Sequence, residues 1–407
     1  MTQEIKQRIE QIRNGEVPEG YKRCIPYILP SDWSIVKLGK ISDCVSRPNR
    51  DGKDRPTYSI NNQKGFVPQG EQFEEGSYQD LDKSTYKIVK RGEFAYNPAR
   101  INVGSIGRLV EEAEAIVSSL YVCVKLSDQV DGEFFDCWVK TQDFKKEAIR
   151  NLEGSVREYL FYENFSNIRM PLPPLAEQKK IAEMLAACDR VIQLKQKLVD
   201  ELKKLKKVCL EKMFPQKGSS VPEIRFPGFT APWEQRKVSE VCSISTGKSN
   251  TQDKIDDGVY PFYVRSPIIE RSNRYLYDEE AVLTVGDGVG TGKVFHYVNG
   301  KYDLHQRVYR LFGFTEDTDA KFFYHWFSEN FYDRVMSMTA KTSVDSVRLE
   351  MIADMEMTAP SYAEQRRIAN YFDSIDNLIT LHQQELEAAL QKKKVLMQLL
   401  LTGIVRV

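Results

Sequence analysis

The sequence lacks the features of a disulfide-rich, metal-binding or membrane-inserted protein. Its seven cysteines are scattered, odd in number and without a Cys-x-x-Cys pair, so neither a disulfide framework nor a zinc knuckle is expected. The four histidines have no metal-ligand spacing such as His-Glu-x-x-His. The longest apolar stretch, around Val395–Val405, is too short and too interrupted to span a bilayer, and the polar N-terminus is no signal peptide. We therefore expect a cytoplasmic protein with no membrane partner.

The sequence also lacks an excess of charge. Lys and Arg together number 58, as do Asp and Glu, so the net charge is zero. This balance argues against a chain that coats nucleic acid by bulk charge, but it permits local basic surfaces. A chain of 407 residues is long enough for two to three domains with sizeable cores.

Two segments resemble catalytic motifs only superficially. Asn97-Pro-Ala-Arg100 is similar to the Asn-Pro-Pro-aromatic site of amino-methyltransferases, but it lacks the second proline and the aromatic residue. No glycine-rich cofactor loop precedes it. The segment Gly286–Val294 resembles a phosphate-binding loop, yet Asp287 and Val294 stand where a glycine and a Ser or Thr are required. The sequence therefore predicts no catalytic residue, no metal site and no bound cofactor.

The chain contains a long internal repeat. The segment Pro173-Pro-Leu-Ala-Glu-Gln-Lys-Lys-Ile-Ala182 recurs 187 residues later as Pro360-Ser-Tyr-Ala-Glu-Gln-Arg-Arg-Ile-Ala369. Weaker matches occur upstream in the same order, among them Trp33 with Trp233 and a glycine-rich turn in each half. This order indicates a variable domain followed by a shared helix, twice over.

Each shared segment has an apolar seam that steps by four and three residues, as in a coiled coil. Both seams become polar at the same two steps, which favours pairing between the two helices over two helices that each cover their own domain. We predict that the two helices pair with each other. Ser361 and Glu364 also have the spacing of a capping box at the second helix start. The seam positions are Ile181, Leu185, Cys188, Ile192, Lys195, Val199, Leu202, Lys206, Cys209 and Met213, and then Ile368, Phe372, Ile375, Ile379, His382, Leu386, Ala389, Lys393, Leu396 and Leu400.

The two variable halves are rich in short strand-like runs, such as 115–126 and 308–314, with helical patterns near 133–150 and 319–336. Their turns carry side chains that can donate to base edges or hold phosphates. Ordinary surface polarity would explain any one of these residues, whereas the set, on equivalent loops of two copies, is a plausible DNA-reading surface. The candidates are Asn97, Arg100, Ser105, Arg108, Ser155, Arg157, Lys248, Ser249, Arg265, Lys293, His305, Gln306, Arg307, Ser343 and Arg348.

With these features the sequence resembles the specificity subunits of Type I restriction–modification systems over essentially its whole length. The motif at 171–178, its reduced copy at 360–365 and the linker 221–233 carry the resemblance. It implies an α+β fold in which two mixed α/β target-recognition domains are joined by two long antiparallel helices. The segments expected are an N-terminal helical segment (1–20), the first recognition domain (21–172), the central helix (173–216), the second recognition domain (217–358) and the C-terminal helix (359–407).

The resemblance also implies a function and partners. Each recognition domain would read one half of a bipartite, asymmetric site in double-stranded DNA, and the helices would set the spacing. Methylation subunits, two in number, and restriction–motor subunits would join the complex and would bring S-adenosylmethionine, ATP and Mg. The shared residues at the helix starts, Glu177, Gln178, Glu364 and Gln365, are the predicted partner contacts.

Two other functions fit parts of the pattern. A duplicated protein-binding scaffold would share the repeat and the seam but would not select a DNA sequence. A fused methyltransferase or nuclease half would need the cofactor loop that the sequence lacks. Finally, when Trp33 is aligned with Trp233, residues 2–14 align with the end of the first long helix. This alignment predicts that residues 2–14 form a helix, which would lie beside the C-terminal helix.

Overall fold

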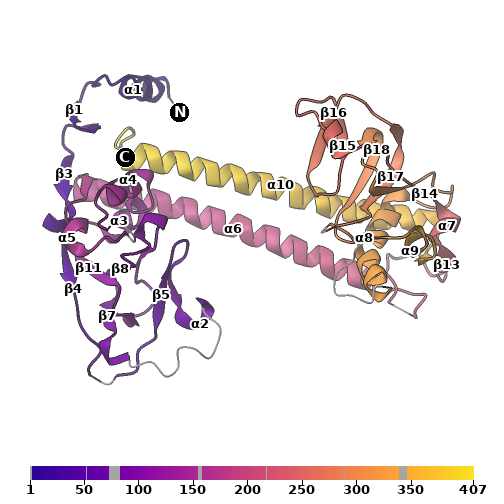
Figure 1. Cartoon of the computed structure of the whole chain (residues 1–407), viewed down its shortest axis with the longest axis horizontal. Helices are drawn as coiled ribbons and strands as arrows, with labels where there is room; N and C mark the ends of the chain where they lie inside the picture. The colour runs from indigo at the N-terminus through magenta and orange to yellow at the C-terminus, as the bar shows by residue number, and fades with distance from the viewer. Residues whose placement is uncertain are drawn as a thin grey trace. The chain divides into compact units, whose positions relative to one another are not determined.

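The computed structural model describes residues 2–51, 53–72, 83–154, 158–216, 218–288, 290–338 and 346–407. The chain forms two compact units, one of Met1–Leu194 with Leu386–Val407 and the other of Lys195–Glu385. Each unit contains one strand-rich domain and one part of each of two long helices (Figure 1).

The two long helices are α6 (Leu175–Met213) and α10 (Tyr362–Leu401), of 39 and 40 residues. All twenty predicted seam positions are buried or half-buried, and most residues between them are exposed. The apolar seam therefore drives the helices together, because burying it removes the apolar side chains of both helices from water.

Ion pairs within each unit fix the antiparallel direction of the pair. Lys206 on α6 lies 2.7 Å from Asp376 on α10 in one unit, and Lys393 pairs with Asp189 in the other. These two pairs occupy the same positions of the internal repeat with the helices exchanged. Both lysines occupy polar positions of the seam. Each meets a carboxylate of the facing helix there, so neither lysine is left in the seam without an oppositely charged partner.

The first unit builds its strand-rich domain from several small sheets. The largest has the order β4-β11-β8-β9, and β10-β7, β12-β3, β1-β2 and β5-β6 form pairs. Its strands are β1 (Tyr21–Cys24), β2 (Tyr27–Pro30), β3 (Ser34–Lys37), β4 (Ser42–Val45), β5 (Tyr58–Asn61), β6 (Gly65–Pro68), β7 (Lys87–Lys90), β8 (Phe94–Tyr96), β9 (Ile106–Arg108), β10 (Glu114–Val117), β11 (Val122–Leu126) and β12 (Arg169–Leu172). Its helices are α1 (Gln3–Arg13), α2 (Gln69–Gln72), α3 (Gly132–Trp138), α4 (Gln142–Arg150) and α5 (Tyr162–Phe165), with short 3-10 turns η1 (Leu38–Lys40), η2 (Lys83–Thr85) and η3 (Ile101–Val103).

The second unit has one larger sheet, in the order β14-β19-β17-β18-β15-β16, and the separate pair β13-β20. Its strands are β13 (Glu234–Lys237), β14 (Ser243–Thr246), β15 (Tyr260–Tyr263), β16 (Ile269–Ser272), β17 (Tyr277–Val285), β18 (Phe295–Leu304), β19 (Val308–Phe312) and β20 (Glu356–Ala359). Its other elements are α7 (Val238–Val241), η4 (Thr251–Asp253), α8 (Ala320–Ser337) and α9 (Leu349–Ala353).

The two domains share a four-stranded sheet despite their different sequences. The order β4-β11-β8-β9 in the first corresponds to β14-β19-β17-β18 in the second, and all of these neighbours are antiparallel. The flanking pairs β3-β12 and β13-β20 correspond as well. The internal repeat seen in the sequence is thus a repeat of topology, and the two domains differ in the strands added around the shared sheet.

Each domain is anchored on the long helices by one aromatic-rich core. In the first unit Trp33 and Trp138 pack with the start of α6 and the end of α10. In the second unit Trp233 and Phe322 pack with the end of α6 and the start of α10. The helices are therefore part of both cores.

The predicted N-terminal helix is present as α1. Arg8 donates to the Ile404 carbonyl at 3.2 Å, and Tyr21 donates to the Gly403 carbonyl at 2.8 Å, so the segment is tied to the residues that follow α10. Its contact is with the end of the chain just after the C-terminal helix, and its apolar residues Ile5, Ile9 and Ile12 are only half-buried.

Candidate nucleic-acid interface

The candidate residues lie on connections at one end of the shared sheet. In an antiparallel sheet the end of one strand meets the start of its neighbour, so three segments come together there. In the second unit these are the loop after β14 (247–250), the connection between β17 and β18 (286–294) and the turn between β18 and β19 (305–307). In the first unit the corresponding segments are 46–51, 97–105 and 118–121.

Backbone hydrogen bonds join the three segments of the second unit. The Ser249 amide donates to the Leu304 carbonyl at 3.0 Å, and the Gln306 amide donates to the Ser249 carbonyl at 2.8 Å. A Cβ atom at Gly247 would lie 2.2 Å from the Leu304 carbonyl oxygen, so the loop approaches the turn as closely as only glycine allows. The loop and the turn are thus one structural element.

Beneath this element lies a polar cluster of side chains. Ser249 and Asp303 are fully buried, and the Ser249 hydroxyl donates to the Asp303 carboxylate. Arg274 donates to Ser249 Oγ at 3.0 Å, to Asp303 at 3.4 Å and to Asp253 at 2.8 Å. Ser249, predicted to contact DNA, therefore lies below the surface and holds the loop.

His305 has a similar role in the adjoining turn. It is 4% exposed, and its Nδ1 accepts the Arg307 amide at 3.0 Å. Burial, with the nearby charges of Arg265 and Arg307, lowers the pKa of His305. The neutral ring, which can accept at Nδ1, is therefore the favoured form.

The exposed side chains around this cluster are mostly basic. Lys248, Gln306 and Arg307 project from the loop and the turn, and Arg265 is the second residue after β15. Asp287 lies 3.2 Å from Arg265 and 3.8 Å from Arg307. The structure therefore brings four predicted residues together on one surface, on which three basic side chains and the Gln306 side chain are exposed.

The remaining predicted residues of the second unit are more dispersed. Lys293 is exposed, with its ammonium group 5.5 Å from the Tyr332 ring centroid on α8. Arg348 is exposed directly before α9. Ser343 lies outside the described residues.

In the first unit three predicted residues share one connection, between β8 and β9. The Asn97 amide donates to the Ser105 carbonyl at 3.0 Å, and the Ser105 amide donates to the Arg100 carbonyl at 3.1 Å. Arg100 is exposed, whereas Ser105 is 2% exposed and donates to the Ile60 carbonyl at 2.8 Å.

Arg108, at the end of β9, does not join this group. It lies 3.9 Å from Glu133 at the start of α3, and its guanidinium packs against Gly132. Ser155 and Arg157 lie outside the described residues.

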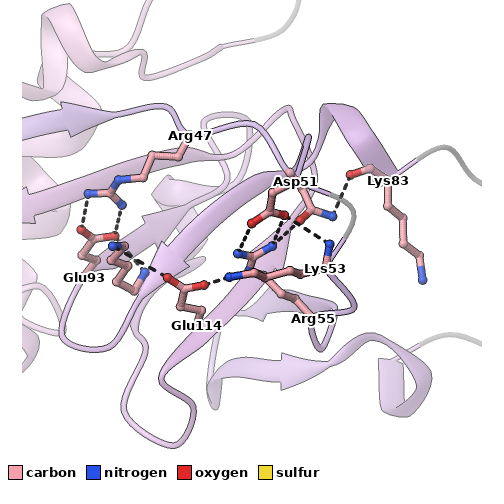
Figure 2. A network of polar contacts seen from close by, with 9 residues as sticks. Arg47, Asp51, Lys53, Arg55, Lys83, Glu93 and Glu114 are labelled. Atoms are coloured by element: carbon pink, nitrogen blue, oxygen red, sulfur yellow. Dashed lines mark hydrogen bonds and ion pairs between the residues drawn. The ribbon is translucent and has the colours of Figure 1, made fainter.

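Sequence reasoning missed the loop after β4, which corresponds to the loop carrying Lys248. Figure 2 shows the ion pairs that hold it: Arg47 binds Glu93 through two 2.8 Å hydrogen bonds, and Arg55 binds Asp51 at 2.6 and 2.7 Å. Arg50 in the same loop is exposed. An alignment of the two halves that matches Arg47-Pro-Asn-Arg50 with the segment around Lys248 would have identified this loop, because both segments follow the first strand of the shared sheet.

Gln178 and Gln365 make the same three hydrogen bonds in the two units. The Gln178 side chain donates to the Pro173 and Gln129 carbonyls, and it accepts from the Asp131 amide just before α3. The Gln365 side chain does the same with Pro360, Asp317 and Asp319 just before α8. Both glutamines are buried, so these contacts join each domain to its long helix.

Glu177 and Glu364 are also buried, each against an arginine. Arg406 and the Trp33 indole donate to Glu177, and Arg225 donates to Glu364 through two 2.7 Å bonds. All four predicted partner contacts thus have internal partners. That they contact another subunit stays a prediction, and nothing in their exposure supports it.

A different surface of α6 is better suited to protein contacts. A second apolar stripe, beside the seam, leaves its side chains 38–69% exposed. Its steps of seven, three and four residues are those of a coiled-coil face. The stripe consists of Met184, Val191, Leu194, Leu198, Leu205 and Val208.

The described residues contain no group of three or more His, Cys, Asp or Glu side chains that could hold a metal ion. Within the same residues no helix is long and apolar enough to cross a membrane. The segment that resembles a phosphate-binding loop connects two antiparallel strands, β17 and β18, whereas a phosphate-binding loop leads from a strand into a helix.

Comparisons with known proteins agree with this organisation. A family model described as the Type I restriction modification DNA specificity domain matches residues 30–204 and 231–391. The Type I restriction enzyme MjaVIII specificity subunit of Methanocaldococcus jannaschii is 27% identical, with 96% of each chain covered. The putative type I restriction enzyme MjaX specificity subunit of the same organism is 24% identical, with 96% of this chain and 97% of the relative covered.

Solved structures share the fold. The Type I restriction–modification S subunit from M. genitalium superposes with a TM-score of 0.61 at 13% identity, covering 90% of this chain and 96% of that one. A chain from a study of complex assembly and conformational transition of the type I R-M system gives 0.55 at 16% identity, covering 93% and 100%. The predicted fold class, two mixed domains with a long antiparallel helix pair, is confirmed.

Proposed function

The chain belongs to the family of Type I restriction–modification specificity subunits, which are non-catalytic, and we propose that its two domains each read one half of a bipartite, asymmetric DNA site. The observation that carries this proposal is that, in both units, the loops at one end of the shared sheet expose basic or amide side chains. The largest such group is Lys248, Gln306 and Arg307 in the second unit. Phosphate contacts would position each domain, and contacts to base edges would specify the sequence.

Two features support different half-sites and a fixed distance between them. The domains share a four-stranded sheet but carry different loops and added strands, so they present different side chains. At 1.5 Å per residue, α6 and α10 are each about 60 Å long. One helical turn of DNA is about 34–36 Å, so helices of this length can separate two readers by a defined number of base pairs.

Type I specificity subunits work with methylation and restriction subunits, and we propose that two methylation subunits dock on the exposed apolar stripe of α6 and its surroundings. The stripe is a better candidate than Glu177 and Gln178, because exposed apolar side chains can be buried by a partner whereas these two residues are already paired. We further propose that S-adenosylmethionine, ATP and Mg are bound by the partner subunits, and that the complex acts in the cytoplasm.

The proposed function is tested by methylome sequencing. A host that expresses this chain with its methylation partner is compared with a host that expresses the partner alone. We expect a new methylated motif with two short defined halves around an unspecified spacer. A soluble complex that adds no methylated motif would contradict the proposal and would favour a protein-binding scaffold.

A further inference from the structure

We propose that Asp303 and Arg274 are positioning residues that hold the loop after β14 and the turn 305–307 in the shape that reads the second half-site. This inference rests on the proposed function. It assigns specificity to the buried Asp303 and to Arg274, whose side chain is 53% exposed beside the loop, in addition to the residues that project from the reading surface.

The Asp303 carboxylate is an unusual group to find in this place. It is fully buried, and it accepts from the Ser249 hydroxyl, from the Leu304 amide at 2.9 Å and from Arg274. Burying a carboxylate costs desolvation, and apolar replacements of buried ion pairs are often as stable. A gain in stability therefore explains this cluster poorly, whereas a requirement for one defined loop conformation explains it well.

The cluster controls the geometry of the exposed residues. Ser249 joins the buried carboxylate to the loop, and the next residue, Asn250, accepts from the Gln306 amide group at 2.6 Å across the gap to the turn. Arg274 closes the far side of the loop through Asp253. Lys248 and Gln306 therefore stand on two segments that are held together by backbone hydrogen bonds and, through their side chains, by this cluster.

In the first unit, a cluster of different residues holds the corresponding loop. Arg55, whose side chain is 7% exposed, donates to Asp51 and Asn49 in the loop after β4 and to Glu114 at the start of β10 (Figure 2). The two loops occupy the same place beside the shared sheet. The sequences of the two clusters are unrelated. Both clusters nevertheless hold the same loop, the one that follows the first strand of the shared sheet.

The test uses the complete complex with its methylation partner and duplexes that carry the motif found by methylome sequencing. Binding is measured to the cognate duplex and to duplexes with one base pair changed in either half, over a range of salt concentrations. The variant is Arg274→Met. Arg271→Gln is the matched control, since this arginine on β16 is exposed and, among the described residues, the one hydrogen bond of its side chain goes to the Val259 carbonyl.

We expect Arg274→Met to reduce discrimination against changes in the second half by about tenfold, the penalty typical of one wrong base pair, and to leave discrimination in the first half unchanged. Its plot of log affinity against log salt keeps the wild-type slope, because a positioning residue neutralises no phosphate. Lys248→Gln, which removes an exposed charge, lowers that slope by about 0.9.

Three results would overturn the inference. Arg274→Met could retain full discrimination in the second half, it could lower the salt slope as Lys248→Gln does, or it could weaken both halves equally. Circular dichroism and thermal melting check that the variant folds. Should it unfold, Ser249→Ala, which removes a single hydroxyl from the cluster, is measured in the same way. A wild-type complex that binds all duplexes equally would instead overturn the proposed function itself, and the inference with it.

Discussion

The buried pair of Arg225 and Glu364 allows a quantitative prediction. Glu364 has a side-chain exposure of 1% and Arg225 of 13%, and two 2.7 Å hydrogen bonds join them. Removal of one partner of a buried pair leaves an uncompensated charge, which costs about 3–5 kcal/mol. Arg225→Met should therefore destabilise the start of α10 by this amount. The double variant Arg225→Met/Glu364→Gln should recover much of the loss, because no buried charge remains.

The equivalent pair in the first unit provides the comparison. Arg406 is 40% exposed, and Glu177 also accepts from the Trp33 indole at 3.0 Å, so Glu177 keeps a donor when the arginine is removed. Arg406→Met should cost about 1–2 kcal/mol.

Hydrogen exchange read by mass spectrometry suits this test, since it measures the opening of each helix start separately. A loss of about 3 kcal/mol accelerates exchange about 150-fold at amides that open locally. Acceleration of less than about fivefold in Arg225→Met, or a double variant that is no better than the single one, would refute the reasoning.

Three other predictions follow from single contacts. Lys206→Glu should destabilise the helix pair by about 1 kcal/mol in denaturant unfolding, and adding Asp376→Lys should restore stability, since the ion pair is re-formed with its charges exchanged; no recovery would contradict the pairing. The exposed thiol of Cys44 should react with a thiol reagent at pH 8, whereas Cys123, whose pKa burial raises to about 12, should react only on unfolding; equal rates would contradict this. Burial lowers the pKa of His305, so the neutral ring's contribution to stability is full above about pH 6.5 and is lost as the pH falls through the folded-state pKa. DNA discrimination in the second half should weaken in that range, and His305→Asn, whose oxygen can accept the same amide without titrating, should remove the pH dependence.

The long helices were predictable because their signal is local and periodic. Every seam position from Ile181 to Met213 has the expected burial, and polar steps such as Lys206 find partners in the facing helix. The repeat in the sequence likewise predicted a duplicated fold. The strand-rich domains were predictable only in outline, since the pairing of β4 with β11 or of β15 with β18 joins segments that are far apart in the chain.

Side-chain roles were harder to predict than elements. Ser361 and Glu364 have the spacing of a capping box, which stays a prediction, whereas the buried contact of the Glu364 carboxylate with Arg225 was not predicted. Ser249 and His305 have side chains that could read bases, yet the fold buries them. Hydrogen-bonding capacity is visible in a sequence, whereas burial depends on packing between distant segments. The segment bounds and the DNA contacts, those of Ser155, Arg157 and Ser343 included, stay predictions.

The most direct test of the account exchanges one domain. Residues 220–357 are replaced by the corresponding segment of another specificity subunit whose methylated motif is known, and the methylome of a host with the hybrid and the methylation partner is sequenced. We expect one half of the motif to change to that of the donor, while the other half stays as in the wild-type chain. A hybrid that changes both halves, or that methylates the wild-type motif unaltered, would contradict the claim that each domain reads its own half-site.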